Sequence, residues 1–177
     1  MSSNQDEALR YPIGKLQVRE GYGLEEIRTL IATIEATPAK VEALAATLSA
    51  KQLDTAYRPG GWTARQVIHH LADSHMNAYI RLKWTLTEPT PTIKAYDEKA
   101  WAETPEVKGD PQVSIALLKT LHAKWATLLH ELTAQDLKKQ FLHPETGKHV
   151  LIERQIATYA WHGEHHLGHL KIVTGSR

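Results

Sequence analysis

Hydrophobic residues recur at intervals of three and four positions through most of the chain, which is the spacing of one face of an α-helix. The clearest example is the segment 63–87, whose apolar stripe consists of Ala64, Val67, Ile68, Leu71, Ala78, Leu82 and Leu86. Thr63 and Gln66 have capping-box spacing at its start, and Pro89 prevents the helix from continuing. The pattern therefore predicts a long helix over 63–87.

Three further segments have the same periodicity. The first, 24–48, contains Pro38, which disrupts a helix interior and predicts either one kinked helix or two. The second begins with an Asp-Pro pair suited to a helix start and covers 111–131, and the third covers 152–173. With the segment 63–87, these make four long amphipathic helices.

The segments between these helices carry prolines and glycines, and strand patterns are almost absent. We expect an irregular arm over 1–22, a loop with a short turn over 88–110, and a loop or a tight hairpin over 142–150. The segment 88–110 is longer than neighbouring antiparallel helices require. The sequence therefore predicts an all-α chain that forms a single domain over 1–177, a four-helix bundle with one long crossover connection.

Composition is that of an ordinary globular protein and disfavours several function classes. Of 177 residues, 42% are hydrophobic and 23% charged, and 21 Lys and Arg against 20 Asp and Glu give a net charge of +1. There is no basic run to bind nucleic acid, no apolar stretch of the ~20 residues that span a bilayer, and no signal-peptide pattern at the start. We expect a cytoplasmic protein that binds neither nucleic acid nor membranes.

Histidine is the unusual residue of this composition. Cysteine is absent, so any metal site must use nitrogen and oxygen ligands. There are 11 histidines, and most fall in two clusters on the second and fourth predicted helices: His69, His70 and His75, then His162, His165, His166 and His169.

Helical projection separates the first cluster by direction. His75 falls within the apolar stripe, which is typical of a core histidine with a satisfied hydrogen bond. His69 lies nearly opposite and is expected to be exposed to solvent. His70 lies beside the stripe, in a polar strip that includes Ser74, Asn77 and Arg81.

In the second cluster, His162 and His166 lie beside the apolar stripe of their own helix, while His165 and His169 point further round. The positions i and i+4 place two imidazoles one turn apart on one face, where they can bind one metal ion. The glutamate of the zinc motif His-Glu-x-x-His is missing, so a metallopeptidase mechanism does not follow.

Two alternatives stay open at this point. The histidines could form a polar bundle edge, with their imidazoles bonded to Asp73, Glu164 and the backbone. His75 could also replace His70 as the third ligand, because spacing alone does not exclude it.

Six motifs resemble those of a known family. They are Tyr-Pro-Ile-Gly at 11–14, Asp-Thr-Ala-Tyr-Arg at 54–58, Gly-Gly-Trp-Thr at 60–63, His-His-Leu-Ala-Asp-Ser-His-Met-Asn at 69–77, Tyr-Asp-Glu-Lys-Ala-Trp at 96–101 and Tyr-Ala-Trp-His-Gly-Glu-His-His at 159–166. In this order, and over nearly the whole chain beyond the first ten residues, they resemble the YfiT-like metal-dependent hydrolases of the DinB superfamily, some of which act as bacillithiol S-transferases.

The resemblance implies a DinB-type bundle, a homodimer, and one zinc or nickel ion per chain. The metal ligands of the family fall on His70, His162 and His166. The residue pair between the last two ligands varies in the family, so the resemblance assigns no role to Glu164.

Three imidazoles and no carboxylate would leave a divalent ion with an open coordination position. There the ion could lower the pKa of water for hydrolysis, or ionise a low-molecular-weight thiol for transfer to an electrophile. We place a hydrolase acting on a small molecule first and a thiol S-transferase second. A metal-binding stress protein without turnover is the third hypothesis.

Candidates for catalytic or substrate contacts are Arg81, Asn77 and Tyr159, with Asp73, Ser74 and Glu164 as further polar neighbours. The Arg81 guanidinium could pair with a substrate carboxylate.

Overall fold

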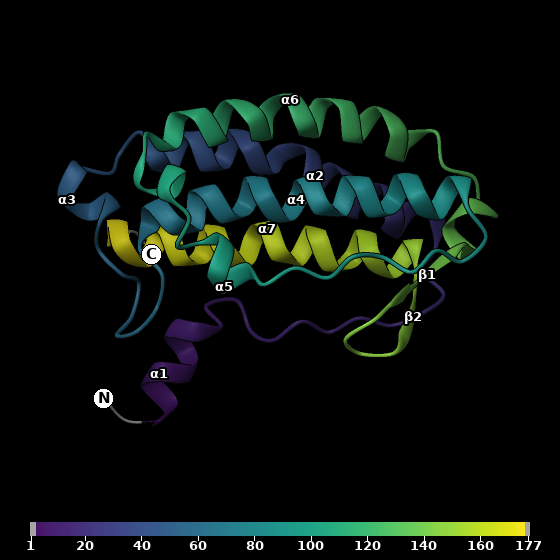
Figure 1. Cartoon of the computed structure of the whole chain (residues 1–177), viewed down its shortest axis with the longest axis horizontal. Coiled ribbons are helices and arrows are strands. Elements are labelled where there is room, and N and C mark those ends of the chain that lie inside the picture. Colours follow the sequence, from purple (N-terminus) through teal and green to yellow (C-terminus); the bar gives the residue numbers. More distant parts are fainter. Residues whose placement is uncertain (1–2, 176–177) are drawn as a thin grey trace.

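The computed structural model describes residues 3–175 and has four long helices packed side by side (Figure 1). They are α2 (Leu24–Ala45), α4 (Ala64–Thr87), α6 (Pro111–His130) and α7 (Ile152–Thr174). Helix α2 packs on α6 and α7, and α4 packs on the same two helices. The predicted four-helix bundle is confirmed.

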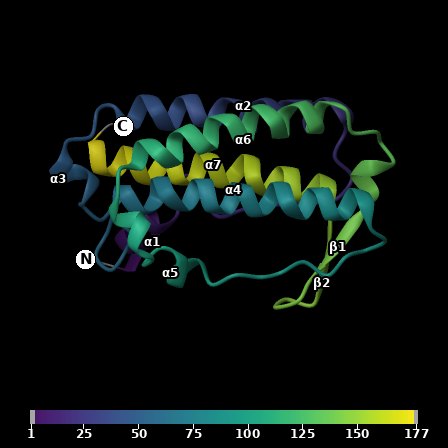
Figure 2. The same cartoon turned by 45° about the horizontal axis from the view of Figure 1, so that its top comes forward.

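A long crossover separates α4 from α6, as predicted. The segment 88–110 returns along the length of the bundle, so that α4 and α6 run in the same direction (Figures 1 and 2). It contains two short helical turns, α5 (Glu98–Trp101) and η1 (Pro105–Lys108). The carboxylate of Asp97 begins α5 by accepting from two backbone N–H groups of its first turn.

The helix starts and stops are those that local chemistry predicts. Thr63 and Gln66 form a reciprocal capping box before α4. The Asp110 side chain accepts a backbone N–H at the start of α6, where Pro111 is the first helical residue. Gly175 ends α7 in the left-handed conformation, with φ of 72°.

Helix α2 is one helix, with Pro38 buried in its interior. Proline has no backbone N–H, so the carbonyl of Ile34, four residues earlier, loses its usual partner in the helix. After α2 the chain makes the short helix α3 (Ala50–Leu53), which a capping box of Ser49 and Gln52 begins.

The prediction of an irregular arm over 1–22 is wrong for its first part, because Ser3–Arg10 form helix α1; residues 1 and 2 lie outside the described residues. A polar helix this short is marginal alone, so sequence pattern does not reveal it. Docking stabilises it: the Arg10 carbonyl accepts from His169 Nε2 at 3.2 Å, and Pro12 packs closely on Gly168 of α7.

A tight hairpin, one of the two predicted alternatives for 142–150, precedes α7. It follows the short turn η2 (Asp136–Lys138) and pairs β1 (Gln140–His143) with β2 (Lys148–Leu151) in antiparallel fashion. The backbone of Leu142 also bonds to that of Pro91 and Ile93, so β1 anchors the start of the crossover.

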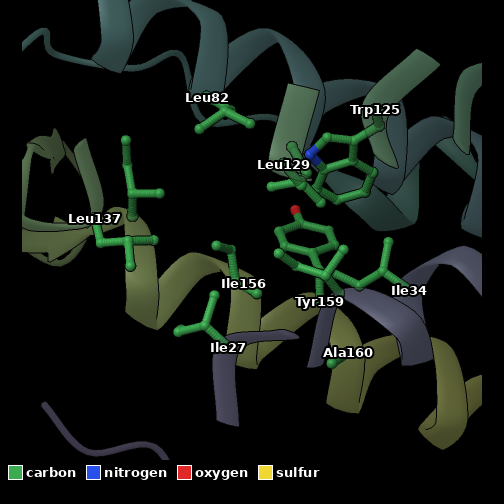
Figure 3. Close-up of a cluster of buried hydrophobic side chains, with 12 residues drawn as sticks. Ile27, Ile34, Leu82, Trp125, Leu129, Leu137, Ile156, Tyr159 and Ala160 are labelled. Carbon is green, nitrogen blue, oxygen red and sulfur yellow. The ribbon is translucent and has the colours of Figure 1, made fainter. Parts of the chain in front are cut away.

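Two apolar clusters occupy the two halves of the bundle. Figure 3 shows the first, in which Trp125 and Tyr159 meet with ring centroids 5.7 Å apart. The second contains Leu71, Leu118 and Leu167. Each long helix has a buried polar residue between the two clusters, namely Thr37, His75, His122 and His166, so the bundle has a polar layer near its middle. No helix within 3–175 has the length and apolar character needed to cross a membrane.

Candidate metal centre

Three histidines from α4 and α7 meet in this polar layer. Ring nitrogens of His70, His162 and His166 all lie within 4.8 Å of one another. The two Nε2 atoms of His70 and His162 are 3.2 Å apart. Imidazole nitrogens that bind one tetrahedral ion at ~2.0–2.1 Å stand about 3.3 Å from each other. The spacing therefore fits a shared divalent ion.

Burial keeps these rings neutral. It lowers the pKa of His70 to about 4 and holds the pKa values of His162 and His166 well below their ordinary value, with neighbouring imidazoles adding to the effect. At pH 7 each ring therefore has one nitrogen lone pair, the form that binds a metal.

A chain of buried histidines determines which nitrogen of His162 has that lone pair. His122 Nδ1 lies 2.7 Å from the carbonyl oxygen of Ile34, which can only accept, so His122 carries its proton on Nδ1. Its Nε2 must then accept from His75 Nδ1 at 2.8 Å. His75 Nε2 in turn accepts from His162 Nδ1 at 3.1 Å. The lone pair of His162 is left on Nε2, the atom that faces His70.

The Ile34 carbonyl is free to receive this bond because Pro38 lacks the N–H that would otherwise occupy it. The interior proline of α2 thus affects the tautomer of His162, which is linked to the Ile34 carbonyl through three hydrogen bonds.

A second, shorter chain orients His166. The carbonyl of Arg10, the last residue of α1, accepts from His169 Nε2 at 3.2 Å. The remaining nitrogen of neutral His169, Nδ1, then accepts from His166 Nδ1 at 3.3 Å. The lone pair of His166 is therefore also on Nε2.

The hydrogen bonds differ between the groups of histidines that lie close enough to share an ion. His165, His166 and His169 form another such group, but His169 has both ring nitrogens in hydrogen bonds. His75 likewise uses both of its nitrogens. It is fully buried with satisfied hydrogen bonds, as its place in the apolar stripe predicts, and has no lone pair left as a third ligand.

The expectation that His69 is exposed to solvent is wrong. His69 is buried with 6% exposure, and its Nδ1 lies 2.7 Å from Ser114 Oγ, because η1 and the start of α6 cover that face of α4. Of the alternative of a polar edge bonded to Asp73, Glu164 and the backbone, the described chain has the backbone bonds, at His122 and His169, but no histidine bond to either carboxylate. Glu164 pairs with Lys40, and Asp73 bonds to no histidine; burial raises its pKa to about 6.

Sequence reasoning missed His122, although a signal was present. His122 continues the apolar stripe of its helix, four residues after Leu118 and three before Trp125, as His75 does in α4. Two histidines inside the apolar stripes of two different helices could have indicated a buried histidine pair.

Two clefts open onto the histidines. The first, about 640 Å³, is lined by His70, His162 and His166, and Trp62 packs on His70 with ring centroids 4.6 Å apart. The second, about 680 Å³, is also lined by His162. Glu98 and Lys99 of α5 line both. Helix α5 therefore forms a shared wall.

Of the three candidates for catalytic or substrate contacts, the structure brings two to the second cleft. Arg81 and Tyr159 line it, and the Tyr159 ring lies 5.5 Å from that of His162 between centroids. Asn77 lines neither of the two clefts and donates to the backbone of Asp73.

Comparison with known proteins gives the family of this chain. The sequence profile described as DinB superfamily matches residues 33–170. The chain belongs to the DinB superfamily. The DinB relatives include the Bacillus subtilis (strain 168) protein named "Putative metal-dependent hydrolase YfiT", 48% identical over 163 residues, with 92% of each chain covered. A Bacillus cereus (strain 03BB102) protein of the same description is 50% identical over 162 residues, with 92% of this chain and 93% of the relative covered.

The DinB fold is also found in a solved structure. That of YfiT from Bacillus subtilis, described as a probable metal-dependent hydrolase with an unusual four-helix bundle topology, matches with a TM-score of 0.92 and 46% identity. The match covers 96% of this chain and 99% of that chain. The recognition of a YfiT-like DinB protein from sequence motifs is confirmed. The DinB relatives are named for metal-dependent hydrolysis, and this chain has histidine groups that could bind a metal.

Proposed function

We propose that this protein is a metal-dependent hydrolase that binds one zinc or nickel ion through His70, His162 and His166. The observation that carries the proposal is the convergence of three neutral imidazoles beside an open cleft, two of them with the Nε2 lone pair set by hydrogen bonds. No carboxylate belongs to the group, so the donor set suits an ion with an open position. Such an ion would supply Lewis acidity towards a substrate or water.

The chain's own residues would position this ion and its substrate. His75 and His169 hold His162 and His166 in orientation, which is how residues behind metal ligands raise affinity. Trp62 packs on His70 at the cleft wall. The cleft volume of about 640 Å³ suits a small organic substrate.

One observation favours the second candidate, a thiol S-transferase. His162 borders both clefts, so two different molecules could approach the same site from two sides. A hydrolase needs room for one organic substrate, whereas a transferase must hold a thiol and an electrophile together.

Metal analysis tests the ligand set. His70→Ala and His166→Ala should each abolish stoichiometric zinc or nickel binding, because two imidazoles hold an ion weakly, while His130→Ala on the exposed face of α6 should keep it. Elemental analysis of the purified proteins measures this. One ion per chain in the His70 variant would contradict the ligand assignment.

Turnover tests the chemistry. Holo protein and the His70→Ala variant are supplied with activated esters and amides, and separately with a chlorinated nitrobenzene, each with and without bacillithiol. Cleavage without thiol that is lost in the variant supports the hydrolase. Thiol-dependent conjugation would replace it with the transferase, and no turnover on any substrate would favour a non-catalytic metal-binding protein.

We also propose that the protein is a homodimer and is located in the cytoplasm. Val113 and Leu117, one turn apart on α6, expose 71% and 42% of their surface and offer an apolar contact. Light scattering would measure the dimer, and cell fractionation the location.

A further inference from the structure

Arg81 is a buried cation without a counter-ion in the described chain. Its side chain lies on α4 and is 9% exposed, and no carboxylate within 3–175 forms an ion pair with it. One guanidinium nitrogen donates to the carbonyl of Lys94 at 3.1 Å, but Nε is buried with no hydrogen-bond partner. A buried charge that lacks compensation is unfavourable, so a guanidinium retained in this state needs an explanation.

The Arg81 side chain borders the second cleft, the one of about 680 Å³ that His162 also lines. Tyr96 of the crossover lies against the guanidinium, whose carbon is 5.9 Å from the ring centroid. His143 of β1 lines the same cleft, and its Nδ1 is a second buried nitrogen without a partner. Two side chains from two different elements therefore border one cavity, and each has one buried nitrogen without a hydrogen-bond partner.

The charges around this cleft indicate how much negative charge its ligand carries. Arg81 is the buried cation, whereas Asp97, Glu98 and Glu145 are exposed acidic residues that line the cleft, with Lys99 beside them. One interior cation compensates one negative charge. These exposed acidic residues disfavour a phosphate dianion, which they repel more strongly than a monoanion.

We propose that this second cleft is a subsite for the carboxylate of a monoanionic substrate, with Arg81 as its counter-ion and His143 as a neighbouring donor. A guanidinium matches a carboxylate in geometry, and the charge-assisted bond is strong in a buried site. Because His162 lines the cleft, a substrate anchored at Arg81 would extend toward the proposed metal site. That part rests on the proposed function, whereas carboxylate binding itself does not.

Binding of phenylacetate to metal-free His70→Ala protein tests the subsite, since an ion in the first site could itself bind a carboxylate. Phenylacetamide, which has the same shape without the charge, and inorganic phosphate are the comparison probes. Calorimetry should detect binding of phenylacetate but not of phenylacetamide or phosphate. The imidazole resonances of His143 should shift when phenylacetate binds.

Arg81→Gln in the same background should weaken phenylacetate binding about tenfold or more, and Arg81→Lys should keep part of it. The matched control Lys83→Gln removes an exposed cation from the same helix at a residue that does not line the cleft, and it should change affinity less than about twofold. Circular dichroism checks that each variant is folded. If Arg81→Gln misfolds, the His143 shift and the phenylacetate affinity of the Arg81→Lys protein test the proposal instead.

Unchanged affinity in a folded Arg81→Gln protein would overturn the proposal. So would equal binding of phosphate, or phenylacetate binding that needs the metal. Phenylacetate binding that depends on Arg81 in a protein without any turnover would support the subsite and contradict only the hydrolase.

Discussion

His75 Nε2 lies 3.1 Å from His162 Nδ1, so a fully buried histidine decides which nitrogen of a cleft histidine is protonated. The tautomer of His75 is itself fixed by its hydrogen bond to His122, and that of His122 by its hydrogen bond to the Ile34 carbonyl. A backbone oxygen of α2 thus fixes which nitrogen of His162, a proposed ligand on α7, has the lone pair. In metal sites, hydrogen bonds that orient a ligand in this way raise metal affinity without adding a contact to the ion.

Replacing His122 should therefore weaken metal binding although His122 does not reach the site. His122→Phe keeps a ring in the core but removes both nitrogens, so His75 and His162 are no longer held in one tautomer. We expect the dissociation constant for zinc to rise about 10- to 100-fold. Titration against a competing chelator measures it, with His130→Phe on the same helix as the control. Unchanged affinity in the folded protein would contradict the chain of tautomers.

Pro38→Ala should make the helix more stable while weakening the affinity for metal. Alanine restores an N–H that competes for the Ile34 carbonyl, so His122 is held less firmly and zinc should bind about 2- to 10-fold more weakly. The helix itself should become more stable, because the unfavourable interior proline is gone. Denaturant unfolding and zinc titration measure the two effects. In the His122→Phe background the substitution should leave zinc affinity unchanged, and a further loss there would disprove the link.

The buried histidines predict how metal binding depends on pH. With the pKa of His70 lowered to about 4, protons compete weakly with the ion, so zinc affinity should change little between pH 8 and 6 and fall steeply only below about pH 4. A steady decline beginning near pH 6.5, the value of an exposed histidine, would argue against this buried site.

Stability of the metal-free protein should follow the same groups. Burial lowers the pKa values of His122 and His169 to about 4, so between that value and about 6.5 the unfolded chain binds protons that the folded chain does not. The free energy of unfolding should therefore be fully present above about pH 6.5 and decrease as pH falls toward 4. Urea unfolding at several pH values measures it; a free energy that rises on acidification would contradict the neutral buried state.

Gly168→Ala should detach the N-terminal segment from α7. An added Cβ would stand 2.6 Å from Pro12 Cγ and 3.0 Å from Pro12 Cβ, so the Pro12 contact cannot persist unchanged. We expect a loss of about 1–3 kcal/mol in stability, typical of overpacking. Faster proteolysis in 3–14 and weaker zinc binding should accompany it, since the Arg10 carbonyl would no longer hold His169. Unchanged proteolysis would show that the Pro12 contact is not needed for docking.

Features determined by neighbours in the chain were predictable. The capping box of Thr63 and Gln66, the Asp110–Pro111 start and the Gly175 stop each depend on residues within one helical turn, and the structure has all of them. The i, i+4 pair His162 and His166 is equally local, because helix geometry alone places both rings on one face.

The exposure of His69 and the state of 3–10 could not be predicted in this way. Projection ranks the directions around one helix, but η1 and α6 cover the face that carries His69. The polar segment Ser3–Arg10 becomes a helix where α7 offers Gly168 and His169 as docking partners.

The sequence by itself determined four amphipathic helices, a crossover between the second and third, and two histidine clusters, because periodicity and caps act within a few residues. Only the tertiary structure decided which lone pairs are free, since the bonds from Ile34 to His122 and from Arg10 to His169 join residues 88 and 159 positions apart. It also left Arg81 unpaired beside His162, because no carboxylate from another element reaches that side chain in the described chain. Hydrogen bonding and charge compensation between distant segments depend on how the helices pack, and the local sequence pattern does not specify that packing.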